Sequence, residues 1–259
     1  MMLHQSTWPA VEAYLRKSTG IVVPMGSTEQ HGPTGLIGTD SMTAQAVAQA
    51  MAVSCGALVG PTLTLGPAQF NLGFPGTVSL RPGTLTRVII DYVQSLSVQG
   101  FRHFYFLNGH GGNLAPARCA FQELHTDHSL GRTGAPALQF RLCSWWDYPQ
   151  ANALRQRLYG AAEGMHGTPS EVAITRALSP GDCPADTLSA PPSLDAEFIR
   201  THAGDNHANA TQHRAQFPDG RVGSHSALGL ADHGGEFIRL AAADAAADYL
   251  AFIADAMRS

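Results

Sequence analysis

The chain has 259 residues, of which 44% are hydrophobic and 14% are charged, and its formal net charge is −4. This length suits one large domain, predicted over residues 1–259, with ample apolar material for a buried core. The sparse charge favours a homo-oligomer that buries part of its surface. The lack of a basic stripe excludes nucleic acid as the main partner.

The cysteines and the hydropathy of the chain indicate its compartment. Cys55, Cys119, Cys143 and Cys183 form no CxxC pair, which is typical of reduced thiols in a cytosolic protein. The first residues contain no apolar signal region, and no run approaches the ~18 apolar residues of a membrane span. We therefore expect a soluble cytoplasmic protein that does not bind membranes.

In the first hundred residues, apolar runs bounded by glycine and proline alternate with stretches of helical periodicity. Pro9 suits the first turn of a helix, and Asp40 or Ser41 is a natural N-cap. The predicted elements, in chain order, are a short helix opening at Thr7, a buried strand over 20–26, a helix over 41–53, a strand over 57–65, an irregular loop to Gly83 and an amphipathic helix over 84–98.

The same alternation continues further along the chain. The predicted elements are a central strand over 101–107, a helix capped by Asn113 and running to about His125, a strand over 136–143, a helix after Thr168 and a final helix over 236–257. Residues 179–235 are rich in Pro, Gly, Asp and His, so we expect loops and short pieces there, as an oligomer arm or an active-site arm. Strands that alternate with helices predict an α/β fold with a mostly parallel, doubly wound sheet.

Two carboxylates and two imidazoles occur where such a sheet would present them at one rim. Glu29 and His31 are two residues apart just after the first strand, so an extended segment would project both from one face. Asp40 directly precedes a helix, and His110 lies in Asn108-Gly-His-Gly-Gly-Asn113 after the central strand. Ligands gather beyond the carboxyl ends of parallel strands, and this mixed donor set suits Zn, Mn or Fe. The pattern predicts two divalent metal ions per chain.

Each of these four residues also has a structural explanation. Asp40 alone could be an N-cap, and Glu29 a solvated loop carboxylate. His31 could form hydrogen bonds in a turn, and His110 could support a glycine-rich turn between strand and helix. We favour metal binding because all four residues map to the same rim.

Further candidate site residues follow later strands. His166 and Glu171 are the predicted catalytic residues: His166 as a proton shuttle, and Glu171 acting through water, although the capping box Thr168-Pro-Ser-Glu171 explains that glutamate structurally. Trp145 and Trp146 could form an aromatic wall over a substrate, although packing is the more frequent fate of such a pair. Together with Gly111 they are the predicted substrate-binding residues.

The remaining chemistry-bearing residues add no second site. His202, His207, His213, His225 and His233 lack ligand spacing and are interpreted as solvated or interface histidines. The chain has no Gly-x-Ser-x-Gly elbow, no P-loop and no GxGxxG, so nucleophilic and dinucleotide-binding functions have no support.

At these motifs the chain resembles the creatininase (creatinine amidohydrolase) family. The family pattern reads here as Gly26-Ser-Thr-Glu29-Gln-His31-Gly-Pro33, then Thr39-Asp40, then Asn108 to Asn113, with a Phe-Pro-Gly-Thr-x-Ser-Leu segment at 74–80 and a His-to-Glu segment at 166–171. The resemblance covers nearly the whole chain. It implies a cytoplasmic, three-layer α/β/α protein, commonly hexameric, that hydrolyses C–N bonds in cyclic amides or formamides.

The resemblance also implies a division of the ligands. Glu29 and His110 would hold one ion, His31 the other, and Asp40 would bridge both. The family's creatininase has a glutamate two residues after the metal-binding His, where this chain has Gly112, so the second ion lacks that ligand. The chain is closer to the Asn-Gly-His-Gly-Gly-Asn members. Thr34, Ala68, Phe70 and Asn71 also depart from the usual pattern, where a substrate would be recognised, so creatinine is not the expected substrate.

These features predict a dinuclear-metal amidohydrolase that cleaves a C–N bond in a small cyclic amide or formamide. Two alternatives remain open. One is a peptide-processing hydrolase of the mycofactocin-maturation type. The other is a non-catalytic, oligomeric metal or ligand binder, which Ala68 and Phe70 favour because they replace polar groups in the expected substrate loop.

Overall fold

Three parallel strands form the sheet at the centre of the computed structural model, which describes residues 1–134, 137–185, 187–207 and 209–256. They are β1 (Gly20–Met25), β2 (His103–Asn108) and β3 (Gln139–Ser144), in the order β1-β2-β3. The register places Val22 beside Tyr105, and Tyr105 beside Arg141. The predicted central strand over 101–107 is therefore confirmed, although its ladder begins at His103.

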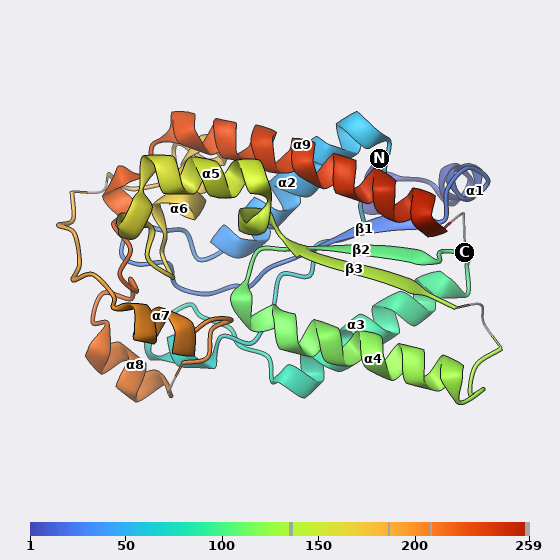
Figure 1. The fold of residues 1–259 in the computed structure, drawn as a ribbon, viewed down its shortest axis with the longest axis horizontal. Coiled ribbons are helices and arrows are strands. Elements are labelled where there is room, and N and C mark those ends of the chain that lie inside the picture. Colours follow the sequence, from blue (N-terminus) through green and yellow to red (C-terminus); the bar gives the residue numbers. More distant parts are fainter. Residues whose placement is uncertain (135–136, 186, 208, 257–259) are drawn as a thin grey trace.

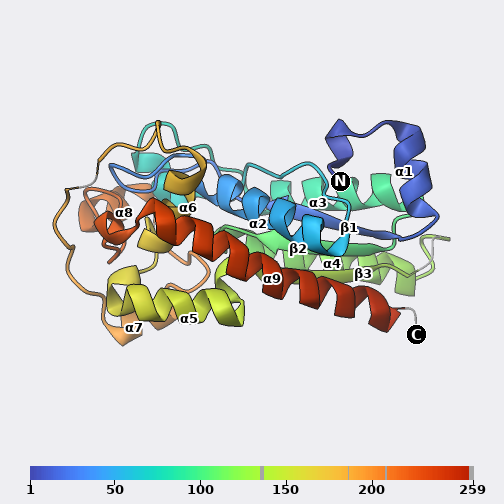
Figure 2. The same ribbon diagram turned by 90° about the horizontal axis from the view of Figure 1, so that it is seen from above.

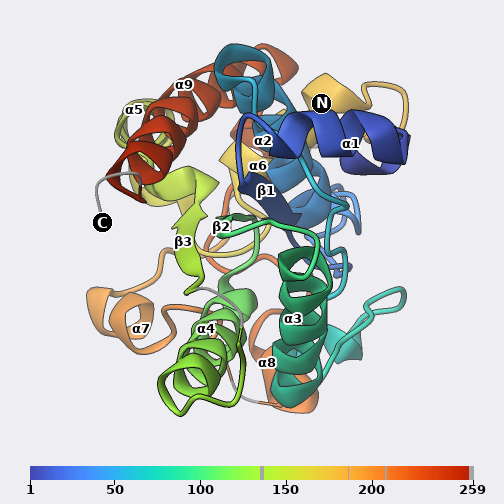
Figure 3. The same ribbon diagram turned by 90° about the vertical axis from the view of Figure 1, so that its right-hand side faces the viewer.

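Helices cover both faces of this sheet and give a three-layer α/β/α arrangement (Figure 1, Figure 3). One face carries α2 (Thr39–Cys55), α5 (Pro149–Leu158), α6 (Pro169–Leu178) and α9 (Ala231–Ala256). Figure 2 shows α9 running along the molecule beside α2, and the two helices are in contact. The other face carries α3 (Pro82–Ser97) and α4 (Leu114–Ser129), which pack against each other. The predicted α/β class with a parallel sheet is confirmed.

The remaining elements lie at the two ends of the sheet. Helix α1 (Trp8–Leu15) lies at the end where both termini are found, whereas α7 (Ala196–Thr201) and α8 (Ala210–Gln216) lie at the opposite end (Figure 1). Short 3-10 helices occur at Leu3–Gln5, Gln69–Gly73, Gly111–Asn113, Trp145–Asp147, Gly160–Glu163 and Ser226–Leu228.

Successive residues of β1 and β2 serve opposite layers, as the two-residue period of a strand requires. Val22 and Tyr105 belong to the apolar cluster that includes residues of α2 and α9. Ile21 and Phe104 belong to the cluster formed with α3 and α4. Because both faces are covered, every residue of β1 is buried, which explains its uninterrupted apolar sequence.

The prediction of a regular strand over 57–65 is wrong. Among the described residues, this segment contributes only isolated bridges: Val59 to Val22 and to Met2, and Leu63 to Met25. Pro24 and Pro61 each lack the N–H that a continuous ladder needs, and the segment facing β1 carries an extra residue between the two bridges to β1. The segment follows the edge of β1 without pairing along its length.

Two predicted helix starts also need correction. Gly38, and not Asp40 or Ser41, is the N-cap of α2, so Asp40 lies in the first turn with its side chain available for other contacts. Helix α9 begins at Ala231 and not at Glu236, so Gly234 lies inside the helix. A Cβ at this position would lie 2.0 Å from the Ala173 carbonyl oxygen, so only glycine fits here. This glycine permits close contact between α6 and α9, which outweighs its low helix propensity.

Other sequence predictions agree with the structure more closely. The helices expected at Thr7, over 84–98, after Asn113 and after Thr168 are present as α1, α3, α4 and α6. The strand expected over 136–143 is present from Gln139, and its predicted start at Pro136 lies outside the described residues. Met257, the predicted end of the final helix, also lies outside them. Within 179–235 the described chain forms loops, the short helices α7 and α8, a 3-10 helix at Ser226–Leu228 and the start of α9. Sequence patterns missed α5.

None of the helices that the structure describes is both long enough and apolar enough to cross a membrane.

Candidate metal centre

The four predicted ligands converge at the carboxyl ends of β1 and β2. Glu29 and His31 follow β1, Asp40 lies in the first turn of α2, and His110 follows β2. All four are buried, with between 1% and 3% of each residue exposed. The site is therefore at the rim where open α/β sheets bind ligands.

Two glycines bring the backbone of Asp40 close to both strands. A Cβ on Gly26 would lie 2.5 Å from the Asp40 carbonyl carbon, and a Cβ on Gly109 would lie 2.2 Å from its carbonyl oxygen. Only glycine leaves room for so close an approach. The start of α2 is thereby held between the ends of β1 and β2.

Glu29, Asp40 and His110 form the first group of potential ligands. His110 Nδ1 lies 3.2 Å from Glu29 Oε1 and 3.2 Å from Asp40 Oδ2. Its other ring nitrogen, Nε2, lies 2.7 Å from the Pro67 carbonyl oxygen, to which it donates. A backbone carbonyl that fixes one ring nitrogen and leaves the other to face carboxylates is the usual environment of a metal-binding histidine.

His31, Asp40 and Glu171 form a second group. His31 Nε2 lies 2.8 Å from Asp40 Oδ1 and 3.8 Å from Glu171 Oε1. Its Nδ1 is 3.1 Å from the Glu29 carbonyl oxygen, so a backbone carbonyl also fixes this imidazole, but through the opposite ring nitrogen to that of His110. Asp40 presents one oxygen to each group, which is the geometry of a bridging carboxylate.

The buried negative charge of these groups lacks a cationic partner other than histidine. Glu29 Oε1 and Oε2 and Asp40 Oδ2 are buried and accept no hydrogen bond from the described residues. In the described part of the chain, every ion pair of these two carboxylates has a histidine as its partner. Burying unpaired carboxylates is costly, and divalent cations would compensate for it. The donor set therefore fits metal ions.

The pKa values of this cluster reflect the same imbalance. Burial alone would lower the pKa of His31, but the carboxylates of Asp40 and Glu171 outweigh it and raise the pKa to about 10. Burial would also lower the pKa of His110. The carboxylates of Glu29 and Asp40 outweigh this effect and hold the pKa well above its usual value. For Asp40, burial raises the pKa but the two histidines lower it to about 2. The carboxylates thus attract positive charge to both imidazoles, where a bound cation would take the place of the protons.

His166 lies against the same carboxylate from a different segment. Its Nδ1 is 3.6 Å from Glu29 Oε1, its Nε2 is 2.6 Å from the Gln30 carbonyl oxygen, and its ring stacks 4.5 Å from that of His31. Burial, followed by the positive charge of His31, lowers the pKa of His166 to about 3. His166 is therefore neutral at pH 7.

Glu171 forms the predicted capping box and also lies beside the candidate metal ligands. Its Oε1 accepts a hydrogen bond of 2.6 Å from the Thr168 N–H, and Thr168 Oγ1 accepts one from the Glu171 N–H, so the predicted capping box is present. The same carboxylate faces the second group of ligands. Burial is the main cause that raises the pKa of Glu171 to about 7. Such a group exchanges a proton readily at neutral pH.

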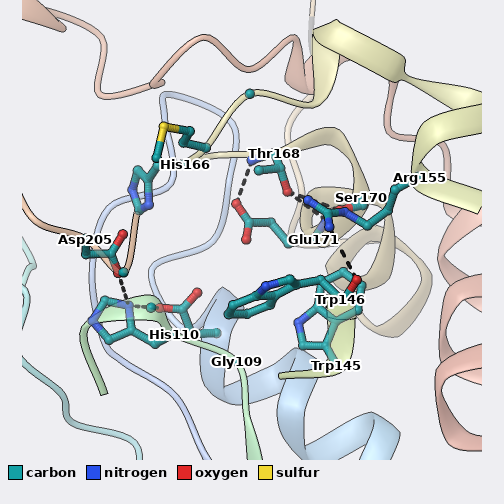
Figure 4. A pocket seen from close by; sticks show the side chains of 15 residues that line it. Gly109, His110, Trp145, Trp146, Arg155, His166, Thr168, Ser170, Glu171 and Asp205 are labelled. Atoms are coloured by element: carbon teal, nitrogen blue, oxygen red, sulfur yellow. Dashed lines mark hydrogen bonds and ion pairs between the residues drawn. The ribbon is translucent and has the colours of Figure 1, made fainter. Parts of the chain in front are cut away.

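The predicted substrate-binding residues line a cavity of about 180 Å³ beside the cluster (Figure 4). Gly111, Trp145 and Trp146 all contribute to it. Trp145 is only 1% exposed and belongs to the apolar core, which agrees with the packing role left open for the pair. Arg155, which the sequence did not single out, also lines the cavity and is paired with Glu163. The cavity thus has an acidic side and an aromatic side.

Asp205 is the site residue that sequence reasoning missed. It lines the cavity and its Oδ2 is 3.5 Å from His110 Nδ1 (Figure 4). Its surroundings, Ala203-Gly-Asp-Asn206, indicate a turn but not the place of that turn in the fold. The placement depends on contacts with residues far away in the chain.

Two histidines interpreted as solvated or interface residues are packed against the site loop instead. The rings of His207 and His213 lie 4.6 Å and 4.9 Å from that of Phe70. Phe70 is fully buried, and its neighbour Asn71 places its side-chain amide 3.3 Å from His166 Nε2. Phe70 and Asn71 therefore both contact His166, one through its ring and the other through its amide.

Comparisons with known proteins agree with this geometry. The family model described as "Creatininase: Creatinine amidohydrolase" matches residues 4–249. A creatinine amidohydrolase of Pseudomonas putida is 32% identical over 192 residues, which cover 67% of this chain and 70% of the relative. A mycofactocin precursor peptide peptidase of Mycolicibacterium smegmatis is 40% identical over 100 residues, covering 36% of this chain but only 40% of the relative.

Solved structures share the whole fold. A creatininase mutant complexed with creatine has a TM-score of 0.78 at 25% identity, covering 95% of this chain and 96% of that chain. Two further creatininase structures, described as a Mn form and a Zn-Zn form, each have a TM-score of 0.78 at 24% identity and cover 97% of this chain and 98% of theirs.

Proposed function

This chain belongs to the creatininase family, and from that premise we propose that it is a dinuclear-metal amidohydrolase acting on a small cyclic amide or a formamide. Membership of the family and potential metal-binding groups support hydrolysis in general. The observation that carries the proposal is the buried carboxylate of Asp40, which faces one histidine of each group with a different oxygen.

In the proposed centre, Glu29 and His110 would hold one divalent ion, His31 would hold the other, and Asp40 would supply an oxygen to each. Glu171 completes the second group from the start of α6. Mn and Zn in structural neighbours support these metals, and Fe suits the same donors. Paired ions of this kind lower the pKa of water and polarise a carbonyl group.

The protein side chains then transfer protons and exclude bulk water from the cavity. Neutral His166 can take a proton at its Nδ1, which faces Glu29, while its Nε2 stays bonded to the Gln30 carbonyl. The proton passes from His166, or from Glu171 through water, to the leaving nitrogen. Trp145 and Trp146 limit access of bulk water from the aromatic side of the cavity and orient the substrate.

A cavity of about 180 Å³ favours a small substrate over an extended chain. Phe70 and Asn71 also argue against a non-catalytic binder. Their side chains support His166 and its neighbours, so the altered loop still serves the residues that would transfer protons.

The second candidate is a peptide-processing hydrolase. The mycofactocin peptidase relative of M. smegmatis supports it, and the Gly111-Gly112 sequence is the feature that the resemblance shares with such members. Because the match covers less than half of that relative, its activity serves here only as an alternative.

A substrate panel separates these candidates. Protein reconstituted with Mn or Zn would be incubated with five- and six-membered lactams, formamides and short peptides, and products identified by mass spectrometry, with Asp40→Ala as the inactive control. We expect ring opening or loss of formate. Cleavage of peptides alone would establish the second candidate, and no turnover by fully metal-loaded protein would leave the non-catalytic binder.

We further propose that the chain works in the cytoplasm as a homo-oligomer, hexameric by resemblance to the family. Trp8, Val53 and Val98 are large apolar residues with 76%, 87% and 84% exposure, which suits burial against other copies. Light scattering coupled to gel filtration measures the assembly, and a monomer at micromolar concentration would overturn this part of the proposal.

A further inference from the structure

Asp205 brings a further carboxylate to the proposed metal centre from a segment outside the sheet. It lies between α7 and α8, and 15% of its side chain is exposed. Its Oδ2 accepts a hydrogen bond of 2.7 Å from the Gly112 N–H and lies 3.5 Å from His110 Nδ1. Figure 4 shows Asp205 beside His110, on the cavity wall opposite the tryptophans.

The backbone at Asp205 is strained but well supported. Its φ of 56° is the single positive value among the described non-glycine residues. Such a conformation persists only where the surrounding structure imposes it, and it is often found at functional sites. On one side His202 stacks 3.8 Å from the ring of Phe198, and on the other side His207 packs 4.6 Å from that of Phe70. These aromatic contacts fix both ends of the turn.

The glycine pair after His110 is shaped to receive this side chain. A Cβ on Gly111 would lie 2.6 Å from Asp205 Oδ2, so a larger residue at position 111 would displace the carboxylate. Gly112 supplies the N–H that holds it. Position 112 is also where the resemblance to creatininase lacks its glutamate. By that resemblance the absent glutamate would have served the ion at His31, whereas Asp205 adds its carboxylate beside His110, on the side of the other ion.

Three carboxylates therefore surround a single nitrogen. Glu29 Oε1, Asp40 Oδ2 and Asp205 Oδ2 lie 3.2, 3.2 and 3.5 Å from His110 Nδ1. The first two oxygens are buried and accept no hydrogen bond from the described residues. A proton on Nδ1 satisfies at most one of these oxygens well, whereas a divalent cation attracts all of them.

We propose that Asp205 is an additional ligand of the ion held by Glu29, Asp40 and His110. This inference rests on the proposed dinuclear centre and deepens it. A merely structural role needs only an acceptor for the Gly112 N–H, which an asparagine oxygen also provides. A ligand role needs the negative charge, so Asp205→Asn distinguishes the two.

The test measures the affinity of purified full-length protein for Mn²⁺ and Zn²⁺ by competition with a chromophoric chelator. We expect two ions in the wild type, and in Asp205→Asn one of them bound at least about 10- to 100-fold more weakly, the range for loss of even an outer partner. Asp182→Asn is the matched control, since it removes the same charge from an exposed position of the same irregular region and should leave both affinities unchanged.

A second variant keeps the test decisive if Asp205→Asn folds poorly. Gly111→Ala leaves Asp205 intact but places a methyl group where its carboxylate lies. Gly111→Ala should weaken the binding of the same ion when Asp205 is present. In protein that already carries Asp205→Ala, it should lower the affinity little further. The visible absorption of the Co²⁺-loaded protein should change in both single variants, because it reports the ligands of the ion directly.

The outcomes are distinct. Two ions bound with unchanged affinity and unchanged Co²⁺ spectrum in Asp205→Asn would overturn the ligand role while leaving the metal centre in place. A wild type that binds no Mn²⁺, Zn²⁺ or Co²⁺ would overturn the proposed function itself.

Discussion

Glu29, His31 and His110 follow the ends of two paired strands, whereas His166 and Asp205 reach the same cluster from segments outside the sheet. The first group is fixed by backbone pairing between β1 and β2, by covered faces and by glycines that admit the start of α2. The second is fixed by side-chain contacts with the Phe70 loop and by a capping box. We call Glu29, His31 and His110, with Asp40 at the start of α2, the strand-borne half, and His166 and Asp205 with their supporting loops the loop-borne half. The strand-borne half is suited to hold metal, and the loop-borne half to adjust chemistry and specificity.

Substitution of His166 gives the largest expected effect that separates the two halves. His166→Gln should lower turnover about 10²- to 10⁴-fold, the usual contribution of a general acid or base, while both metal affinities stay near wild type. Steady-state kinetics and metal titration on the same preparation measure the two effects. A parallel loss of metal would instead place His166 among the ligands, together with Glu29 and His31.

Metal should stabilise the fold through the strand-borne half. At a metal concentration about 100 times the dissociation constant, the free energy of unfolding should rise by about 2.7 kcal/mol per site. Denaturant unfolding with and without Mn²⁺ measures this gain. Asp40→Ala should abolish it, whereas Asp91→Ala, on the exposed face of α3, should retain it.

Acid should loosen the loop-borne half first. Burial lowers the pKa of His207 to about 3 and that of His213 to about 4, below the ~6.5 of the unfolded chain. The unfolded segment therefore binds more protons below pH 6.5. Its stability is retained above that pH and declines towards pH 4, by at most about 2 kcal/mol per imidazole between pH 7 and 5.

Hydrogen exchange over 198–217, corrected for intrinsic rates, follows this loosening. The double variant His207→Phe/His213→Phe keeps the ring packing on Phe70 and should lose most of the pH dependence. Equal loosening of the amides of β1 and β2 in the wild type over the same pH range would contradict a difference between the two halves.

The smallest effect concerns Glu171, which belongs to both halves. Glu171→Ala removes the capping box and should cost about 1 kcal/mol of metal-free stability. Glu171→Gln keeps an oxygen for the Thr168 N–H and should lower the metal-free stability by less than half of that amount. It should nevertheless weaken binding of the ion at His31 as much as the alanine variant does. Chemical unfolding without metal and chelator competition measure the two quantities. Equal metal affinity in Glu171→Gln and the wild type would remove Glu171 from the ligand set.

The strand-borne half could be predicted from the sequence because local patterns determine it. Apolar runs locate β1 and β2, and the residues directly after them must lie at one rim. The same reasoning brought Asp40 to this rim while misassigning it as an N-cap, since the site's close backbone approach is not visible in propensities. The interrupted pairing of 57–65 shows a similar limit, where two prolines break a ladder that the apolar pattern predicts.

The loop-borne half could be predicted only where a motif was local. The capping box gave the start of α6 and hence the position of Glu171. Nothing near Asp205 indicated that its turn would meet Gly112, because that contact joins residues 93 positions apart and depends on the packing of Phe70. The glutamate absent at position 112 concerned the ion at His31, so it gave no indication of a carboxylate beside His110.

Metal content per chain, with Asp40→Ala beside the wild type, tests the central claim most directly. Untagged protein would be reconstituted with Mn or Zn, freed of loosely bound ions by gel filtration and subjected to elemental analysis. A centre bridged by Asp40 predicts about two ions per chain in the wild type and loss of both in the variant. A wild type with no retained metal, or a variant that retains both ions, would contradict it.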